Sequence, residues 1–230
     1  MRVFAHRGAS GYAPENTLAA IKKALDLGIK AIEIDIHNVE GELYVFHDRR
    51  LDSKSSGTGL IEEVSEAYLA TVTVGGEPIP KLWDLLTFLQ GKACLLNIEL
   101  KGMNCLTPFL ELYPKILVEL HYRPEQLLIS SFNHHFIAAV KQRFPAALIA
   151  PLLEGIPRDD AAIVTQLNAY SLHLSLSFIT SELVVDAHRR GAKVYVYTVD
   201  HHDDIDYLRE LGVDGIFSNY PDLSWQYIQS

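Results

Sequence analysis

Short apolar runs alternate with longer amphipathic segments along almost the whole chain. The run at residues 2–6 predicts a first strand, and the segment at 15–28 predicts a helix because Leu18, Ile21 and Leu25 recur at helical spacing. Further strands are expected at 30–37, 93–100, 127–132, 147–153, 172–178, 193–199 and 215–218. Further helices are expected at 81–91, 106–122, 134–144, 160–169, 181–191, 203–212 and 223–229, with a kink or break at Pro114.

This rhythm amounts to eight strand–helix units, and crossover helices imply parallel strands. We therefore predict an α/β fold of the (β/α)8 TIM-barrel type, as a single domain over residues 1–230. A doubly wound open sheet is the alternative, weakened because no Gly-x-Gly-x-x-Gly motif follows the first strand. The Ser- and Gly-rich stretch at about 49–80 interrupts the rhythm and predicts a small insertion after the second strand.

Composition limits the function classes. The 230 residues carry a net charge of −9, which argues against bulk binding to nucleic acid or to an anionic membrane, so an anionic ligand needs a local site. The two cysteines are too few for a disulfide framework, and the N-terminus lacks the apolar region of a signal peptide. We expect a cytoplasmic protein without a transmembrane helix.

Acidic residues lie inside two of the predicted strands. Glu33 and Asp35 alternate with isoleucines, so they share one face of their strand, and Glu99 and Lys101 repeat the pattern in the next unit. Any one of them alone is better explained as a surface residue or an ion-pair partner. Three carboxylates at the C-terminal ends of adjacent barrel strands instead favour one divalent cation with oxygen ligands, Mg²⁺ or Ca²⁺.

Two histidines and two cations fall beside these carboxylates. His6 ends the first strand and His47 follows a short strand, a placement that suits a general base and a general acid. Arg7 and Lys101 could be structural ion-pair partners, but beside a metal they are better explained as contacts to a bound phosphate. Metal, cations and acid together are what phosphoryl transfer requires.

The motifs HRGASGYAPENT, EIDIHNVEGELYVFHD, NIELK, SSFN, VYTVD and GVDGIFSNYPD, which span His6 to Asp222, resemble those of the glycerophosphodiester phosphodiesterase family. The resemblance implies a TIM barrel and metal-dependent hydrolysis of glycerophosphodiesters to glycerol 3-phosphate and an alcohol. Its implied site residues are the metal ligands Glu33, Asp35 and Glu99, the catalytic His6 as base and His47 as acid, and the phosphate contacts Arg7 and Lys101.

Some positions depart from the family pattern. Tyr197 stands where Trp is usual, as a substrate-facing aromatic, and Asp200 stands where Asn is frequent. We expect Ile61 and the 49–80 insertion to line the pocket for the alcohol, whose identity the sequence leaves open.

The expected partner is a small-molecule substrate, with no nucleic acid and no stable membrane association, and the oligomeric state cannot be read. One alternative is a lysophospholipase D- or sphingomyelinase D-like enzyme, for which residues 67–74 (AYLATVTV) are the candidate apolar surface. The other is a non-catalytic barrel that binds a phosphodiester.

Overall fold

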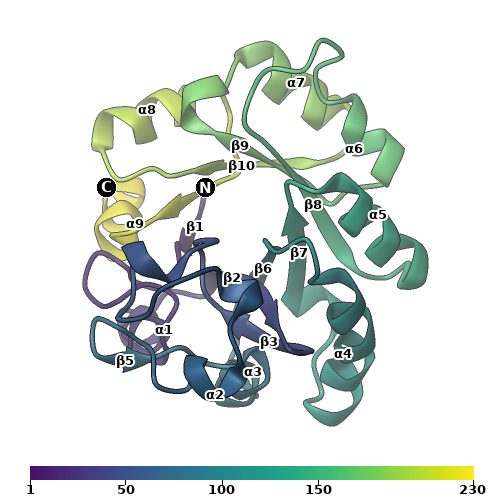
Figure 1. Cartoon of the computed structure of the whole chain (residues 1–230). Coiled ribbons are helices and arrows are strands. Elements are labelled where there is room, and N and C mark those ends of the chain that lie inside the picture. The colour runs from purple at the N-terminus through teal and green to yellow at the C-terminus, as the bar shows by residue number, and fades with distance from the viewer.

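Eight parallel strands close into a barrel in the computed structural model, which describes residues 1–230 (Figure 1). The strands are β1 (Arg2–Ala5), β2 (Ala31–Val39), β6 (Leu95–Leu100), β7 (Leu127–Ser131), β8 (Leu148–Leu153), β9 (Ser171–Ser175), β10 (Lys193–Tyr197) and β11 (Gly215–Ser218). They follow one another in chain order around the ring, and β1 pairs with both β11 and β2. This closure confirms the predicted TIM barrel and excludes the open sheet.

The main helices lie outside the ring of strands (Figure 1). They are α1 (Leu18–Asp26), α3 (Leu82–Leu89), α4 (Leu106–Glu119), α5 (His134–Arg143), α6 (Ala162–Leu167), α7 (Ser181–Arg189), α8 (His202–Glu210) and α9 (Pro221–Gln229). Helix α1 begins later than predicted because the Thr17 hydroxyl accepts a hydrogen bond from the Ala20 amide and caps the helix. Helix α4 continues through Pro114, so the prediction of a break there is wrong.

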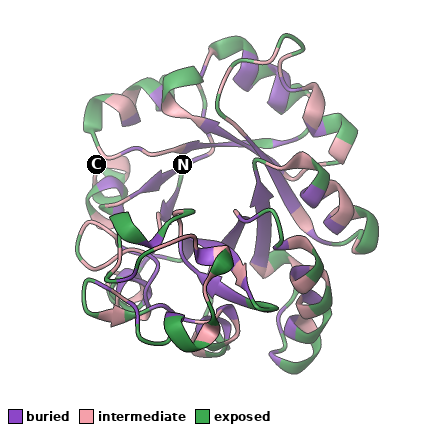
Figure 2. Cartoon of the chain, viewed as in Figure 1, coloured by how far each residue is buried: buried purple, intermediate pink, exposed green.

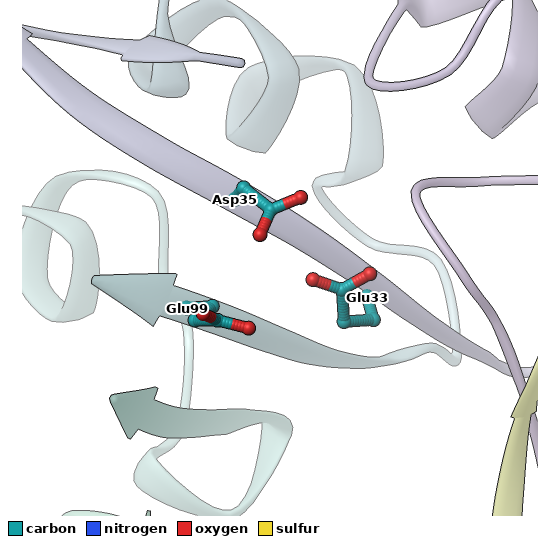
Figure 3. Close-up of side chains that lie close together, drawn as sticks. All are labelled: Glu33, Asp35 and Glu99. Carbon is teal, nitrogen blue, oxygen red and sulfur yellow. The ribbon is translucent and has the colours of Figure 1, made fainter. Parts of the chain in front are cut away.

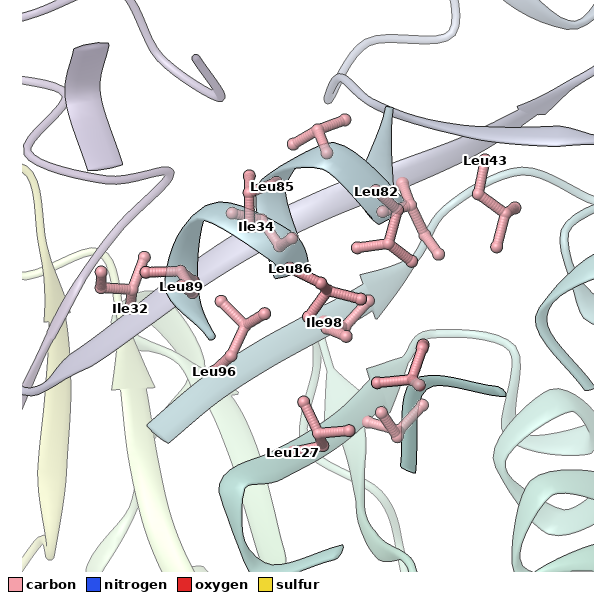
Figure 4. Close-up of a cluster of buried hydrophobic side chains, with 14 of the residues drawn as sticks. Ile32, Ile34, Leu43, Leu82, Leu85, Leu86, Leu89, Leu96, Ile98 and Leu127 are labelled. Atoms are coloured by element: carbon pink, nitrogen blue, oxygen red, sulfur yellow. The ribbon is translucent and has the colours of Figure 1, made fainter. Parts of the chain in front are cut away.

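Alternation along each strand separates the core between barrel and helices from the barrel interior. In β2, Ile32, Ile34 and Ile36 are fully buried and belong to a 31-residue cluster between strands and helices (Figure 4). The intervening Glu33 and Asp35 therefore point into the barrel, and both are buried, like most of the barrel strands (Figure 2). Burying such isoleucines stabilises the fold by roughly 1.5–3 kcal/mol each, which fixes the register that directs the acids inward.

The predicted insertion forms a compact excursion after β2. It follows β3 (Glu42–Val45), which is antiparallel to β2. It consists of two 3₁₀ turns, η1 (Leu51–Ser53) and η2 (Ile61–Glu63), the short helix α2 (Glu66–Leu69), and the pair β4 (Thr73–Val74) and β5 (Glu77–Pro78). Together with Val39, Tyr44 and Phe46, the apolar side chains of the excursion form a cluster of nine buried residues.

That cluster corrects two expectations. Ile61 is fully buried in it and does not line the central cavity. Leu69, Val72 and Val74 are buried there too, so residues 67–74 present no continuous apolar surface. These side chains pack into the buried cluster of the excursion and are therefore not available to a ligand.

Both cysteines are free and buried, as expected for structural thiols. Burial raises the pKa of Cys94 and of Cys105 to about 12, so neither is a thiolate at neutral pH. None of the helices combines the length and the apolar character that crossing a bilayer requires.

Candidate active site

A cavity of about 300 Å³ opens at the C-terminal ends of the barrel strands. It is lined by every residue that the sequence singled out for chemistry. These are His6, Arg7, Glu33, Asp35, His47, Glu99, Lys101 and Tyr197. The position agrees with the end of the barrel at which TIM-barrel enzymes hold their active sites.

Three carboxylates converge at one side of this cavity. Glu33 and Asp35 project from β2 and Glu99 from the neighbouring β6, where Asp35 and Glu99 are register partners (Figure 3). One carboxylate oxygen from each residue lies within 4.8 Å of the others, and all three side chains are buried. Parallel pairing of two strands thus brings together acids that are 64 to 66 residues apart in sequence.

The crowding perturbs their protonation. Burial and the charges of Asp35 and Glu99 raise the pKa of Glu33 well above its usual value. Burial, together with Asp35, raises the pKa of Glu99 to about 7. Burial opposes ionisation of Asp35 too, but Arg7, His47 and Lys101 outweigh it and lower that pKa.

A divalent cation fits this donor set. The three buried acids repel one another, and a bound cation with oxygen ligands would offset that repulsion and favour the ionised forms of Glu33 and Glu99. The absence of cysteine and of a facing imidazole cluster favours a hard cation over a zinc site. Asn16 supports the set, since its side-chain amide hydrogen-bonds Asp35 through both of its polar atoms.

His6 lies at the end of β1, with its ring in the cavity. Its Nδ1 donates to Oδ1 of Asn219 at 2.8 Å, so Nε2 carries the free lone pair. Burial, aided by the positive charge of Arg7, lowers the pKa of His6 to about 4. The imidazole is therefore neutral at pH 7, the state that a general base requires.

His47 follows β3 and has a different environment. Its Nδ1 donates to Oδ1 of Asp48 at 2.6 Å, and its Nε2 lies 3.2 Å from Nζ of Lys101. The buried ring of His37 fixes the backbone here, because its Nε2 bonds the His47 carbonyl at 3.0 Å. Asp48 thus holds the ring of His47 through Nδ1, which leaves Nε2 beside the Lys101 cation at the cavity.

Arg7 is held by the backbone as well as by acids. Its guanidinium contacts Glu15 at 2.9 Å and Asp35 at 3.4 Å, and its own amide donates to Glu33 at 2.9 Å. Its φ of 56° is unusual for a residue with a side chain, and the next residue, Gly8, also has positive φ. A Cβ on Gly8 would lie 2.7 Å from Ala20 of α1, so only glycine allows this turn.

Lys101 is the second cation at the carboxylates. Its Nζ lies 3.0 Å from Glu99 and 3.9 Å from Asp35. The cation also lies 5.6 Å from the ring centre of Phe132. Arg7 and Lys101 thus flank the acidic group, in a position to contact an anion that approaches it.

One wall of the cavity carries two aromatic rings. Phe132 and Tyr197 meet edge to face with ring centres 6.2 Å apart, and the Tyr197 hydroxyl donates to the Leu153 carbonyl at 2.9 Å. Glu154, the next residue, also lines the cavity. The two rings are apolar, whereas the side chains around the carboxylates are charged. This wall therefore suits the organic part of a ligand.

The sequence interpretation missed several supporting residues. They are Asn16, which holds Asp35, Asp48, which holds His47, Asn219, which holds His6, and the wall residues Phe132 and Glu154. The first three lie in the motifs APENT, FHD and FSNYPD, within a few residues of a predicted site residue or strand end. Polar residues next to strand ends were the available signal, and Glu154, directly after β8, carried that signal as well.

A barrel with acids, histidines and cations gathered at the C-terminal ends of its strands defines a phosphoric diester hydrolase of the TIM-barrel class. The sequence profile of the glycerophosphoryl diester phosphodiesterase family matches residues 6–223, so the chain belongs to that family. It is a glycerophosphodiester phosphodiesterase by its class of activity.

Individual relatives agree over nearly the full length. A glycerophosphodiester phosphodiesterase of Caldanaerobacter subterraneus subsp. tengcongensis is 34% identical over 230 residues, which cover 96% of this chain and 94% of that protein. One from Bacillus altitudinis is 30% identical over 233 residues, with 96% and 95% coverage. The structure of an Oleispira antarctica phosphodiesterase in complex with its product sn-glycerol-3-phosphate superposes with a TM-score of 0.92 at 30% identity, covering 100% of this chain and 97% of that one.

Proposed function

We propose that this protein hydrolyses glycerophosphodiesters to glycerol 3-phosphate and an alcohol, with His6 as general base and His47 as general acid. The observation that carries the proposal is the placement of both imidazoles at one cavity with the three carboxylates and two cations. The product bound to the Oleispira phosphodiesterase supports the choice of glycerol 3-phosphate.

The charged side of the cavity would bind the phosphate. Arg7 and Lys101 each exchange part of their contact with Glu15, Asp35 or Glu99 for contact with the phosphate oxygens. Glu33, Asp35 and Glu99 would hold a divalent cation, which when bound neutralises phosphate charge and polarises its nonbridging oxygens. The choice between Mg²⁺ and Ca²⁺ is left to the experiment below.

Proton transfer follows from the two histidine environments. His6 accepts the proton of the attacking oxygen at Nε2, the atom that Asn219 leaves free. As the bond from phosphorus to the alcohol oxygen breaks, His47 gives a proton from Nε2 to that oxygen, and Asp48 holds the ring in place through Nδ1. Hydrolysis consumes one water overall. His6 then releases its proton to solvent and His47 takes one up from solvent, which returns both residues to their starting states.

Tyr197 and Phe132 would contact the organic part of the substrate. Their rings meet edge to face in the lining of the cavity, and the hydroxyl of Tyr197 already donates to a backbone carbonyl. Substrate contact is therefore through ring faces. A lysolipid substrate is less supported, because the apolar residues of 67–74 pack into the excursion.

The test is release of glycerol 3-phosphate from glycerophosphocholine, glycerophosphoethanolamine, glycerophosphoglycerol and glycerophosphoinositol, with EDTA and with Mg²⁺ or Ca²⁺ restored. We expect EDTA-sensitive release that His6→Ala, His47→Ala and Glu99→Gln each abolish without unfolding the chain. The matched controls His135→Ala and Glu111→Gln alter exposed helical positions and should retain full activity. Release that resists EDTA, or survives in any of the three site variants, would contradict the corresponding role.

A further inference from the structure

The side chain of Asn219 connects His6 to an acid that does not reach the cavity. Its Oδ1 accepts two hydrogen bonds, from Nδ1 of His6 at 2.8 Å and from the hydroxyl of Ser10 at 2.8 Å. An amide oxygen offers two lone pairs, so both are used. The orientation of this amide therefore decides which nitrogen of His6 carries the proton.

Asp200 fixes that orientation from the other side. Its Oδ2 accepts from Nδ2 of Asn219 at 2.6 Å. Its Oδ1 accepts from the Asn219 backbone amide and from the hydroxyl of Ser218, each at 2.8 Å. A carboxylate only accepts, so the Asn219 amide can present only its NH₂ group to Asp200 and only its oxygen to His6.

We propose that Asp200 is a positioning residue that sets the tautomer of His6 through Asn219. The inference rests on the proposed function, in which His6 takes a proton at Nε2. A neutral imidazole carries one ring proton, and because Asn219 requires it on Nδ1, the Nε2 lone pair faces the cavity. Asp200 thus acts on the base without contacting it.

Asparagine at position 200 would undo this arrangement. Its oxygen would still have to accept from the Asn219 backbone and from Ser218, which leaves its NH₂ group facing the NH₂ group of Asn219. Two donors cannot pair, and rotation of the Asn219 amide relieves the conflict. The rotated amide presents its NH₂ group to Nδ1 of His6, so the ring proton moves to Nε2, where the base needs a lone pair.

An exchange of the two side chains would restore every partner. In the double variant Asp200→Asn, Asn219→Asp, the new asparagine donates to one oxygen of the new aspartate, whose other oxygen accepts from His6 and Ser10. Asparagine is the residue frequent in the family at position 200, so a defect of the single variant and its repair by the second change would show that the two positions depend on each other.

The experiment compares the wild type, Asp200→Asn, the double variant and the control Asp203→Asn, which makes the same charge change on the exposed first turn of α8. The first readout is the ¹⁵N spectrum of the His6 ring in the metal-free protein at pH 7. We expect the Nδ1–H form in the wild type, the control and the double variant, and the Nε2–H form in Asp200→Asn.

The second readout is steady-state hydrolysis of glycerophosphocholine. We expect kcat of Asp200→Asn to fall about tenfold, the cost of about one mismatched hydrogen bond, with KM within about twofold of the wild type. The double variant should recover most of that loss. Retention of the Nδ1–H form in Asp200→Asn, or a double variant no better than the single one, would overturn the proposal.

The experiment tests the proposed function and the role of Asp200 independently of each other. A wild type that hydrolyses no phosphodiester would contradict the proposed function, while the spectrum would still show whether Asp200 sets the His6 tautomer. If Asp200→Asn alone unfolds, the double variant, which keeps all of the hydrogen bonds, still has to show the Nδ1–H form.

Discussion

Asn16 binds Asp35 through both polar atoms of its side chain. Its Nδ2 donates to Oδ2 of Asp35 at 2.9 Å, and its Oδ1 accepts from the Asp35 backbone amide at 3.2 Å. Asn16 itself has a φ of 58°, and its backbone amide donates to the Arg7 carbonyl at 2.9 Å. One amide therefore joins the loop after β1 to the acid in the middle of β2.

This relationship predicts that Asn16→Ala weakens metal binding. Loss of a group that orients a ligand typically costs about 10–100-fold in metal affinity. The measurement is the Mg²⁺ or Ca²⁺ concentration that gives half-maximal activity, with the exposed Asn104→Ala as control. An unchanged metal requirement in Asn16→Ala would mean that Asp35 holds its orientation without the amide.

Removing one buried acid should stabilise the metal-free protein. Burial and two neighbouring carboxylates disfavour the charge on Glu33, so we expect Glu33→Gln to raise the free energy of unfolding in EDTA by about 1 kcal/mol, or ~2–4 °C in Tm for a chain of this size. Added Mg²⁺ or Ca²⁺ should raise the Tm of the wild type and not of the variant. A variant less stable than the wild type in EDTA would show that the acids do not repel one another as argued.

Asp48 should orient the ring of His47 for proton donation. Burial opposes the ionisation of Asp48, but hydrogen bonds from Ser53 and His47 keep the pKa of Asp48 below its usual value. We expect Asp48→Asn to lower kcat by about tenfold or more, because a neutral amide makes a weaker hydrogen bond to the His47 ring that donates the proton. The control is Asp26→Asn, an exposed acid of α1. A fall confined to KM would assign Asp48 to substrate binding instead.

Asp186 should govern stability in acid. It accepts from Arg190 at 2.8 Å and from the Ala161 amide at 3.0 Å, joining α6 to α7, and Arg190 is the main cause that lowers its pKa from 3.8 to about 2. The unfolded chain therefore takes up this proton first as the pH falls, so the stabilisation is present above pH 4 and is lost between about pH 4 and pH 2.

We accordingly expect Asp186→Asn to unfold at lower urea concentration than the wild type at pH 7, with the two proteins converging towards pH 2. Asp203→Asn on the surface of α8 is the control. Urea midpoints that differ by the same amount at pH 7 and at pH 2.5 would contradict the role of this carboxylate.

Glu154 should make the cavity favour a cationic alcohol. It lines the aromatic wall beside Tyr197, and a carboxylate with ring faces attracts an ammonium group. We expect Glu154→Gln to lower kcat/KM for glycerophosphocholine about fivefold, typical of a solvent-accessible charge contact, and to leave glycerophosphoglycerol unchanged. Equal effects on both substrates would remove Glu154 from head-group selection.

The barrel and the charged side of the site were predictable because each rests on local periodicity. Alternation in β2 assigned Ile34 to the face that packs on the helices, and Glu33 and Asp35 to the interior. Parallel pairing of β2 with β6 then placed Glu99 beside them. Burying a carboxylate is costly, so acids inside predicted buried strands indicate a compensating partner or a functional site.

The remaining contacts depend on tertiary placement. Asn219 reaches His6 across 213 residues only because β11 pairs with β1, and nothing in the spacing encodes the direction of its amide. Ile61 was misplaced for a related reason, since an apolar residue in an insertion fits a ligand wall and a local core equally well by pattern. Pro114 did not break α4, because packing of the helix on the barrel overrides its local cost.

The buried cysteines have a practical consequence. Since Cys94 and Cys105 are enclosed and remain protonated thiols, alkylating reagents should leave the native protein unmodified. A single cysteine introduced at an exposed position in the loop after β8, such as Ile156, would then be the one thiol that reacts. A fluorophore attached there could report ligand arrival at the cavity without prior removal of the native sulfur atoms.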